Sequence, residues 1–388
     1  MLDFSFYNPV RIEFGKNAVA KIAGMIPANA VVMLTYGGGS IFKNGAYQQV
    51  KAALGARKVI EFGGIEPNPH YETCIKAVAL AKQEKVDFLL AVGGGSVVDG
   101  TKFIAAAVKY PGGNLWDIVD SFSNHDTDVV KDALPFGTVI TLPATGSEMN
   151  CGAVISRFEM QLKLHFASEK VFPKFSIINP EFTETLDARQ TGNGIVDTFV
   201  HVAEQFITYD VNTPLIDKMC AGVMRTLIDE APKVFANPHD YAARANICWC
   251  STVGLNGWLG CGVVQDWATH MLGHELTAVY GLDHGRTLAV IMPALWRKFK
   301  VQKRPKLLFL AHEVWGLNGD SDEVVELAIT KTEEFFHSLQ VPTLLSDYGI
   351  DKQQAAEKIR ARLLERNKVF GEHANIDGNI AAEILLHC

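Results

Sequence analysis

The stretch Phe88-Leu89-Leu90-Ala91-Val92-Gly93-Gly94-Gly95-Ser96 (residues 88–96) joins five consecutive apolar residues to a glycine-rich end. A continuous apolar run of this length predicts a strand that is buried on both faces, as in a parallel sheet. Helical patterns over residues 71–85 and 97–109 flank this strand. Further β-rich runs lie at residues 31–36, 59–62, 138–142 and 175–178. Strands that alternate with helices predict an α/β domain whose parallel sheet is covered on both faces.

The second half of the chain has a different pattern. After Pro180 the β-rich runs stop, and apolar residues recur at helical spacing, for example Ile195, Phe199 and Val202. We therefore expect a boundary near residue 183, with an α/β domain over residues 1–183 and an all-helical domain over residues 184–388. The cleft between two such domains is the usual place for a small-molecule site.

Composition excludes several classes of protein. Hydrophobic residues make up 48% of the 388 residues, enough for a large core, which excludes a disordered chain. The formal net charge of −7 argues against nucleic acid as the main partner. Residues 245–265 carry no charge but hold four glycines, which favours a buried core helix over a membrane span. The odd number of cysteines, seven, without zinc-ribbon spacing, predicts free thiols in a reducing cytoplasm, and Met1–Phe6 has no features of a secretion signal.

Two glycine-rich turns are candidates for binding a dinucleotide. Gly37-Gly38-Gly39-Ser40 and Gly93-Gly94-Gly95-Ser96 each follow a predicted strand, where backbone N–H groups can approach a phosphate closely. The alternative is that the glycines only allow tight turns with positive φ. Asp99 would lie in the first turn of the next helix, either at the site or as a solvated carboxylate. The hydroxyl groups of residues 141–148 could line the same groove or belong to an ordinary polar loop.

Histidines in the helical half are candidates for metal ligands. Asp197 and His201 are four residues apart, as are His270 and His274, so each pair projects from one helix face, and His284 follows shortly after. Together they can offer imidazole nitrogens and one carboxylate, which suit Fe²⁺ or Zn²⁺ better than Mg²⁺ or Ca²⁺. The alternative is that each histidine is a hydrogen-bonded structural residue.

A short basic cluster lies further along the chain and has an ordinary explanation. We expect a solvated surface for Arg297, Lys298, Lys300, Lys303, Arg304 and Lys306.

Taken together, these motifs resemble the iron-dependent (group III) alcohol dehydrogenases, and within them the NADPH-dependent aldehyde reductase and butanol dehydrogenase branch. The most specific stretches are residues 62–69, 91–100, 141–148 and 265–285. The resemblance implies a Rossmann-like α/β domain followed by an all-α domain, the dehydroquinate synthase-like fold of the iron alcohol dehydrogenases. It implies reduction of aldehydes to primary alcohols, and the reverse, by hydride transfer from NADPH with the metal as a Lewis acid. A small aldehyde or alcohol is then the substrate, and the family is expected to form a homodimer through the N-terminal domain, with no nucleic acid and no membrane as partners.

The resemblance also implies site residues. The metal ligands would be Asp197, His201, His270 and His284. His274 would lie near the nicotinamide, and His274 and Asp99 are the expected catalytic residues. The expected cofactor contacts are Gly37, Gly38, Gly39, Ser40, Asn68, Gly94, Gly95, Ser96, Asp99, Thr141, Leu142, Ser147 and Lys163.

Three departures from the family pattern bear on these expectations. Many relatives place an Asp where this chain has Gly39-Ser40; without that carboxylate there is room for a 2′-phosphate, which favours NADP(H) over NAD(H). Asp283 stands where many relatives have Pro, which adds a carboxylate near the metal. The usual double Thr is Thr141-Leu142 here. The remaining alternatives are a zinc polyol dehydrogenase, a lyase similar to dehydroquinate synthase, and a non-catalytic sensor of metal and nucleotide.

Overall fold

Strand β4 (Phe88–Gly94) places alternate side chains in two separate hydrophobic cores. Leu89 and Ala91 belong to one core, and Leu90 and Val92 belong to the other. Because successive side chains of a strand point to opposite faces, both faces of the sheet are covered. The predicted parallel sheet buried on both faces is therefore confirmed in this computed structural model, which describes residues 1–123 and 128–388.

The sheet has six strands, all parallel, in the order β1-β8-β5-β4-β2-β3. Besides β4, the strands are β1 (Arg11–Phe14), β2 (Val31–Tyr36), β3 (Lys58–Phe62), β5 (Phe136–Leu142) and β8 (Phe175–Ile178). A separate antiparallel pair consists of β6 (Gly152–Arg157) and β7 (Leu162–Ala167). The apolar runs predicted five strands of the large sheet. They did not predict β1, β6 or β7, because these segments mix polar and apolar residues.

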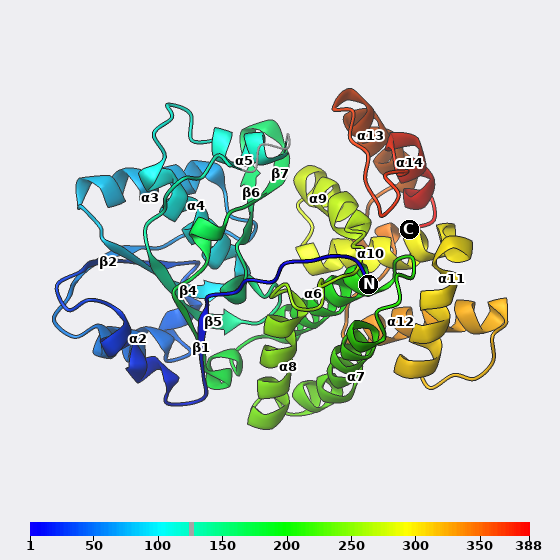
Figure 1. Cartoon of the computed structure of the whole chain (residues 1–388), viewed down its shortest axis with the longest axis horizontal. Coiled ribbons are helices and arrows are strands. Elements are labelled where there is room, and N and C mark those ends of the chain that lie inside the picture. Colours follow the sequence, from blue (N-terminus) through cyan, green and yellow to red (C-terminus); the bar gives the residue numbers. More distant parts are fainter. Residues whose placement is uncertain (124–127) are drawn as a thin grey trace. The chain divides into compact units, whose positions relative to one another are not determined.

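Helices cover the sheet on both sides. Figure 1 shows α3 and α4 over one face and α2 over the other. The helices are α1 (Ile22–Met25), α2 (Ala46–Leu54), α3 (Tyr71–Gln83), α4 (Gly95–Lys109) and α5 (Asp117–Ser123). Helix α4 begins at Gly95, directly after β4 ends at Gly94, so the glycine-rich turn is tighter than the sequence indicated.

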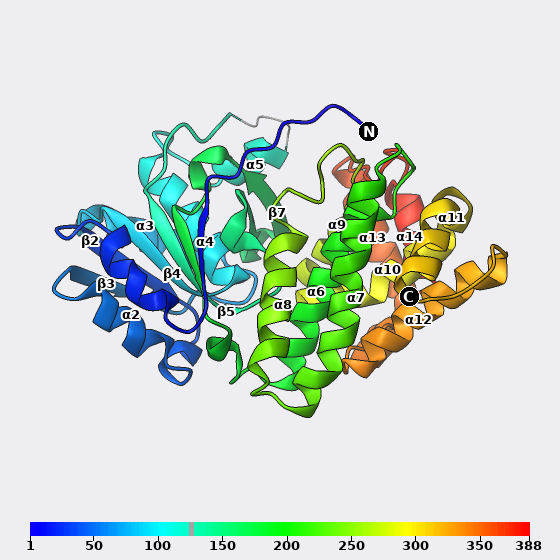
Figure 2. The same cartoon turned by 60° about the horizontal axis from the view of Figure 1, so that its bottom comes forward.

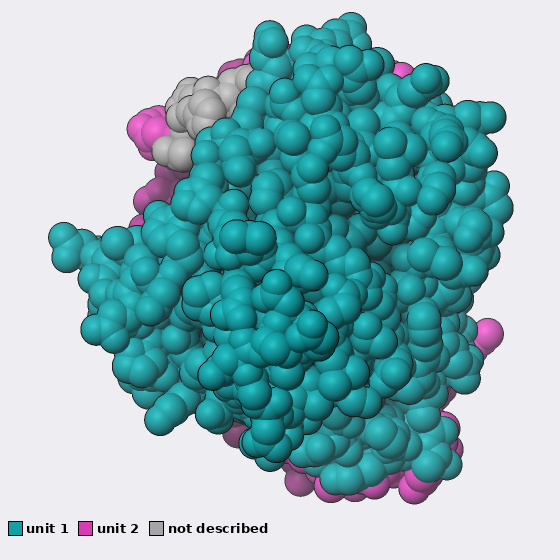
Figure 3. Space-filling view, turned by 90° about the vertical axis from the view of Figure 1, so that its right-hand side faces the viewer, with its two compact units in different colours: residues 1–6, 187–236, 253–388 teal, residues 7–186, 237–252 magenta. Residues whose placement is uncertain are grey.

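The chain forms two compact units, which are coloured separately in Figure 3. The sheet unit consists of residues 7–186 and 237–252, and the helical unit of residues 1–6, 187–236 and 253–388. Residues 1–6 thus belong to the helical unit although the sheet unit follows them in the sequence, and residues 237–252 belong to the sheet unit although helical segments flank them. The assignment of functions to residues 1–183 and 184–388 stays a prediction.

The helical unit is built around α6 (Ala188–Phe206), which is buried over almost all of its last 16 residues. Helix α10 packs against α6, α9 and α12, and α7 lies alongside α6 (Figure 2). The predicted helical periodicity around Ile195 and Phe199 is confirmed. The other helices are α7 (Pro214–Ala236), α9 (Ala268–Tyr280), α10 (His284–Lys298), α11 (Lys300–Phe309), α12 (Asp322–Ser338), α13 (Lys352–Glu365) and α14 (Gly378–Leu385).

The uncharged stretch 245–265 is not one buried helix, so that prediction was wrong. Helix α8 (Tyr241–Gly254) ends within it, and residues 255–265 contain turns and loop. Gly257 and Gly262 adopt φ values of +91° and +69°, which a regular helix does not permit. Among residues 1–123 and 128–388, none of the helices is both long enough and apolar enough to cross a lipid bilayer.

The basic cluster around residues 297–306 is not a uniformly solvated surface, which corrects a second expectation. Lys303 is only 2% exposed, and its ammonium group lies 2.6 Å from Asp266 Oδ2 and 2.8 Å from Glu372 Oε1. Lys306 is also buried and pairs with Asp217 at 2.5 Å. These two lysines are internal ion-pair partners, because carboxylates distant in the sequence surround them.

Candidate active site

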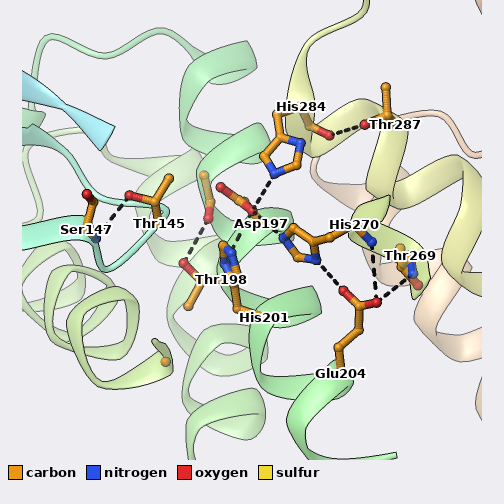
Figure 4. A network of polar contacts seen from close by, with 12 residues as sticks. Thr145, Ser147, Asp197, Thr198, His201, Glu204, Thr269, His270, His284 and Thr287 are labelled. Carbon is orange, nitrogen blue, oxygen red and sulfur yellow. Dashed lines mark hydrogen bonds and ion pairs between the residues drawn. The ribbon is translucent and has the colours of Figure 1, made fainter. Parts of the chain in front are cut away.

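The carboxylate of Asp197 lies among three histidines of the helical unit. Its Oδ1 atom is 3.3 Å from His201 Nδ1, 3.7 Å from His270 Nε2 and 3.8 Å from His284 Nε2. Ligand atoms of Asp197, His201 and His270 lie within 4.8 Å of one another, and these residues are buried. Figure 4 shows the three rings grouped around the carboxylate.

Three helices supply this group. Asp197 and His201 lie one turn apart on α6, His270 lies in the first turn of α9, and His284 is the first residue of α10. Helix α6 is anchored at its start by Asp187, whose carboxylate accepts a hydrogen bond from the Gln190 N–H at 2.7 Å. The spacing of four residues explains why Asp197 and His201 share one face of α6. The packing of α9 and α10 against α6 brings His270 and His284 to them.

The donor set fits a divalent metal ion. In a tetrahedral site with metal–ligand bonds near 2.1 Å, neighbouring ligand atoms are about 3.4 Å apart, close to the distances around Asp197. In the described residues, His201 Nδ1 and His270 Nε2 are buried and accept or donate no hydrogen bond. Buried nitrogens with this geometry are suited to coordinate a cation, and three nitrogens with one oxygen suit Fe²⁺ or Zn²⁺.

The two buried rings differ in their electrostatic surroundings. Burial lowers the pKa of His201 to about 4, so its lone pair is available at neutral pH. Burial also opposes the charged form of His270, but the carboxylates of Glu204 and Asp197 outweigh it and raise its pKa to about 9. A cation that binds His270 would therefore displace a proton.

Asp283, the departure just before His284, is engaged by α6. Its Oδ2 atom accepts hydrogen bonds from Arg189 Nε and Asn193 Nδ2, each at 2.8 Å. Gly285 allows the two helices to approach, because a Cβ atom there would lie 2.5 Å from the Asn193 carbonyl oxygen. The carboxylate of Asp283 thus ties the start of α10 to the helix that carries Asp197.

His274 lies beside the group rather than within its closest contacts. It is 6% exposed, and its ring centroid is 5.3 Å from that of His284 and 6.3 Å from that of His270. It lies one turn after His270 on α9, as the spacing predicted.

The glycine-rich turns lie in the sheet unit at the carboxyl ends of neighbouring strands. Residues 37–40 follow β2, Gly94 ends β4 and is followed by Gly95 and Ser96, and Thr141 and Leu142 end β5. These three strands are adjacent in the order β5-β4-β2, so the segments share one edge of the sheet. This edge is where open α/β sheets bind their ligands.

The glycines of the second turn, Gly93 to Gly95, are required by close packing and not by positive φ angles. A Cβ atom on Gly95 would lie 2.4 Å from Thr145 Oγ1, and one on Gly93 would lie 2.6 Å from Val97 Cγ2. None of residues 93–95 has a positive φ, whereas Gly39 in the first turn has φ +95°. Close packing therefore requires the second set, and backbone conformation requires glycine at position 39.

Asn68, Ser96 and Lys163 form a connected polar group. The Asn68 N–H donates to Ser96 Oγ at 3.2 Å, and Lys163 Nζ donates to Asn68 Oδ1 at 2.9 Å. Three residues expected to contact the cofactor, separated by up to 95 positions in the sequence, thus lie together.

Asp99 is not a solvated helix-start carboxylate, so that alternative is wrong. Its Oδ1 accepts a hydrogen bond from the Ser147 hydroxyl at 2.6 Å, and its Oδ2 accepts one from the Val154 N–H at 2.9 Å. Burial raises the pKa of Asp99. The carboxylate holds the segment that begins at Ser147 against α4.

Lys102 binds the same Ser147 hydroxyl as Asp99, and the sequence analysis did not identify it. It is fully buried, and its Nζ donates to Ser147 Oγ, Asn150 Oδ1 and the Gly152 carbonyl at 2.7–2.8 Å. Burial lowers its pKa to about 8. Its position three residues after Asp99, on the same helix face, is the signal that could have identified it.

Comparison with known proteins assigns the family. A model of the iron-containing alcohol dehydrogenases matches residues 9–180, and a model of the C-terminal part of the same family matches residues 191–384. The chain belongs to the iron-containing alcohol dehydrogenase family. The fold class expected from the resemblance is thereby confirmed.

Several members of this dehydrogenase family are similar along most of their length. The NADPH-dependent aldehyde reductase YqhD of Escherichia coli (strain K12) is 51% identical over 90% of both chains. The NADP-dependent alcohol dehydrogenase 3 of Entamoeba histolytica is 43% identical over 99% of this chain and 98% of that protein. A probable NADH-dependent butanol dehydrogenase of Bacillus subtilis is 41% identical over 99% of both.

Solved structures of the dehydrogenase family share the whole fold. A crystal structure of E. coli YqhD superposes with a TM-score of 0.96 at 48% identity, covering 100% of this chain and 98% of that one. The NADH-dependent butanol dehydrogenase A of Thermotoga maritima superposes with a TM-score of 0.92 at 32% identity, covering 100% and 98%.

Proposed function

We propose that this oxidoreductase reduces small aldehydes to primary alcohols with NADPH as hydride donor, and oxidises the alcohols in the reverse direction. The observation that carries the proposal is the convergence of three histidine nitrogens on Asp197 Oδ1 at 3.3–3.8 Å. Family membership and the names of two relatives, an NADPH-dependent aldehyde reductase and an NADP-dependent alcohol dehydrogenase, support it.

The helical part of the chain, residues 184–388, would hold the metal. The ligands in this proposal are Asp197, His201, His270 and His284. When bound, Fe²⁺ or Zn²⁺ supplies Lewis acidity toward a carbonyl oxygen, and NADPH supplies the hydride. Four buried or half-buried side chains from three helices would fix the position of the substrate oxygen. Holding the carbonyl carbon and the nicotinamide at contact distance contributes on the order of 7–11 kcal/mol at best.

Residues 1–183 would hold the dinucleotide at the carboxyl edge of the sheet. The backbone N–H groups of the two glycine-rich turns would face the phosphates, and the start of α4 adds its positive end. The remaining contacts in this proposal are Asn68, Asp99, Thr141, Leu142, Ser147 and Lys163.

His274 and Asp99 are the proposed catalytic residues. His274 would pass a proton toward the alkoxide oxygen, directly or through water or a cofactor hydroxyl. Asp99 would keep Ser147 oriented, since it accepts the hydrogen bond of that hydroxyl. The pairing of Asp99 with Ser147 is what supports its inclusion.

Oxidation of NADPH by butanal tests the function and the metal together. Protein stripped of metal by a chelator should show no butanal-dependent loss of NADPH absorbance, and anaerobic addition of Fe²⁺ or Zn²⁺ should restore it. The metal that restores the higher kcat/KM identifies the working ion. Full activity of the stripped protein would contradict the proposal, and so would the absence of activity with either metal.

Cofactor preference rests on Gly39 and can be tested with a pair of variants. Gly39→Asp should raise the KM for NADPH about tenfold or more relative to NADH, because the carboxylate would repel the 2′-phosphate. Gly39→Asn is the matched control, since both residues bear the same strain at φ +95° but only one is charged. An equal NADPH/NADH ratio in the two variants would contradict the charge argument.

Location and assembly are also proposals. Seven free cysteines, six of them buried, are consistent with a cytoplasmic protein. A homodimer would use the edge strand β1, near which Tyr7 and Phe14 are 60% and 41% exposed. Sedimentation of the purified protein measures the assembly.

A further inference from the structure

Glu204 is a buried carboxylate that the proposed chemistry does not use. It lies on α6, three residues after His201 and seven after Asp197, and is 4% exposed. Positions at these spacings lie along one side of a helix. Glu204 therefore extends the row of side chains that α6 presents to the metal group.

The carboxylate of Glu204 receives the start of helix α9. Its Oε1 accepts the Thr269 N–H at 2.6 Å and the His270 N–H at 3.4 Å, and its backbone carbonyl accepts the Asp266 N–H at 3.0 Å. Trp267, the residue before α9, provides no side-chain cap. Glu204 thus satisfies N–H groups that a helix start otherwise leaves without a partner.

The second carboxylate oxygen contacts the ring of His270. Oε2 accepts a hydrogen bond from His270 Nδ1, and Figure 4 shows Glu204 on the side of the ring opposite Asp197. A carboxylate only accepts, so Nδ1 carries a proton, and once a cation has displaced the proton on Nε2, the lone pair of Nε2 faces Asp197. Nε2 is the atom that lies 3.7 Å from Asp197 Oδ1.

We propose that Glu204 is a positioning residue that fixes the ring orientation and protonation pattern of His270 for metal binding. The inference rests on the metal site of the proposed function. A carboxylate behind a ligating imidazole holds the ring and raises its basicity as a ligand, and its loss costs 10–100-fold in metal affinity. If Glu204 were only a helix cap, a neutral side chain of the same shape would replace it with little effect.

Glu204→Gln separates these two roles. The glutamine oxygen can still accept the two backbone N–H groups, but the amide NH₂ then faces His270 Nδ1 and donates to it. Nδ1 would have to lose its proton to accept that bond, and the proton would move to Nε2, the atom needed as ligand. If the glutamine amide were flipped, its NH₂ group would instead face the N–H donors of Thr269 and His270, whose hydrogen bonds it cannot accept.

The test is a titration of metal-free protein with Co²⁺, followed by the visible absorption of the bound ion. The Kd of Glu204→Gln should rise 10–100-fold, with an altered absorption spectrum. Glu275→Gln is the matched control. Glu275 is a second buried carboxylate, on α9, and it binds Arg362 and Arg366 at 3.0 and 2.5 Å rather than a histidine. The Kd of the control should stay within threefold of the unmodified protein.

A Kd of Glu204→Gln within threefold of the unmodified protein would overturn the inference. Failure of the unmodified protein to bind Co²⁺ would instead overturn the proposed metal site itself. If Glu204→Gln does not fold, ¹⁵N NMR of Zn²⁺-loaded unmodified protein decides. It should show a proton on His270 Nδ1 and none on Nε2, and the opposite pattern would overturn the inference.

Discussion

Replacement of His270 by alanine should abolish both metal retention and aldehyde reduction. His270 Nε2 is a buried nitrogen with no hydrogen bond among the described residues, and it faces Asp197 Oδ1 at 3.7 Å. Loss of the metal would remove several kcal/mol of stabilisation of the developing charge. A loss of about 4 kcal/mol of transition-state stabilisation lowers kcat/KM roughly a thousandfold. The measurements are metal content after dialysis and kcat/KM for butanal with NADPH.

His312→Ala is the matched control for that experiment. His312 belongs to the same unit but contacts the Gly319 carbonyl at 2.8 Å, away from Asp197. The control should keep its metal and its activity. A His270→Ala protein that retains metal and reduces butanal at the unmodified rate would show that the ligand assignment is wrong.

Lys303→Met should be the most destabilising of the substitutions in the basic cluster. The methionine would fill similar volume but leave Asp266 and Glu372 without their buried cation, and the Ile207 carbonyl without a donor at 2.8 Å. Removing one partner of a buried ion pair costs about 3–5 kcal/mol. Chemical denaturation followed by circular dichroism measures the loss.

Lys300→Met provides the comparison. The Lys300 side chain is 33% exposed and lies 3.8 Å from Glu326, so its ion pair contributes about 0–1 kcal/mol. Equal losses of stability in the two variants would contradict the interpretation of Lys303 as an internal ion-pair partner.

Much of the fold was predictable because the decisive signals are local. Strands β2 and β8 coincide with the predicted runs, since a strand buried on both faces is mostly apolar along its length. Strand β1, with the sequence RIEF, has no such run: Glu13 is buried, and its charge is offset by Lys21 and Arg11. Lys21 lies outside the strand, so the strand's own sequence does not show that the charge of Glu13 is offset.

The site shows the same division. Asp197 and His201 were predicted to share a face because they lie one turn apart on a single helix. Glu204 is on the same helix and was missed, because its role depends on where α9 begins in space. Lys303 was assigned to a solvated surface because charged clusters usually are solvated, whereas its partners Asp266 and Glu372 are 37 and 69 positions away.

The interleaving of the two compact units limits how the polypeptide can be divided. Residues 237–252 return to the sheet unit, where Cys248 joins the hydrophobic core and Thr252 donates to the buried Glu148 carboxylate at 2.6 Å. A fragment that stops at residue 183 would lack both and expose the carboxylate and the core they cover. Split-enzyme reporters and domain exchange between homologues should therefore carry residues 237–252 along with the sheet.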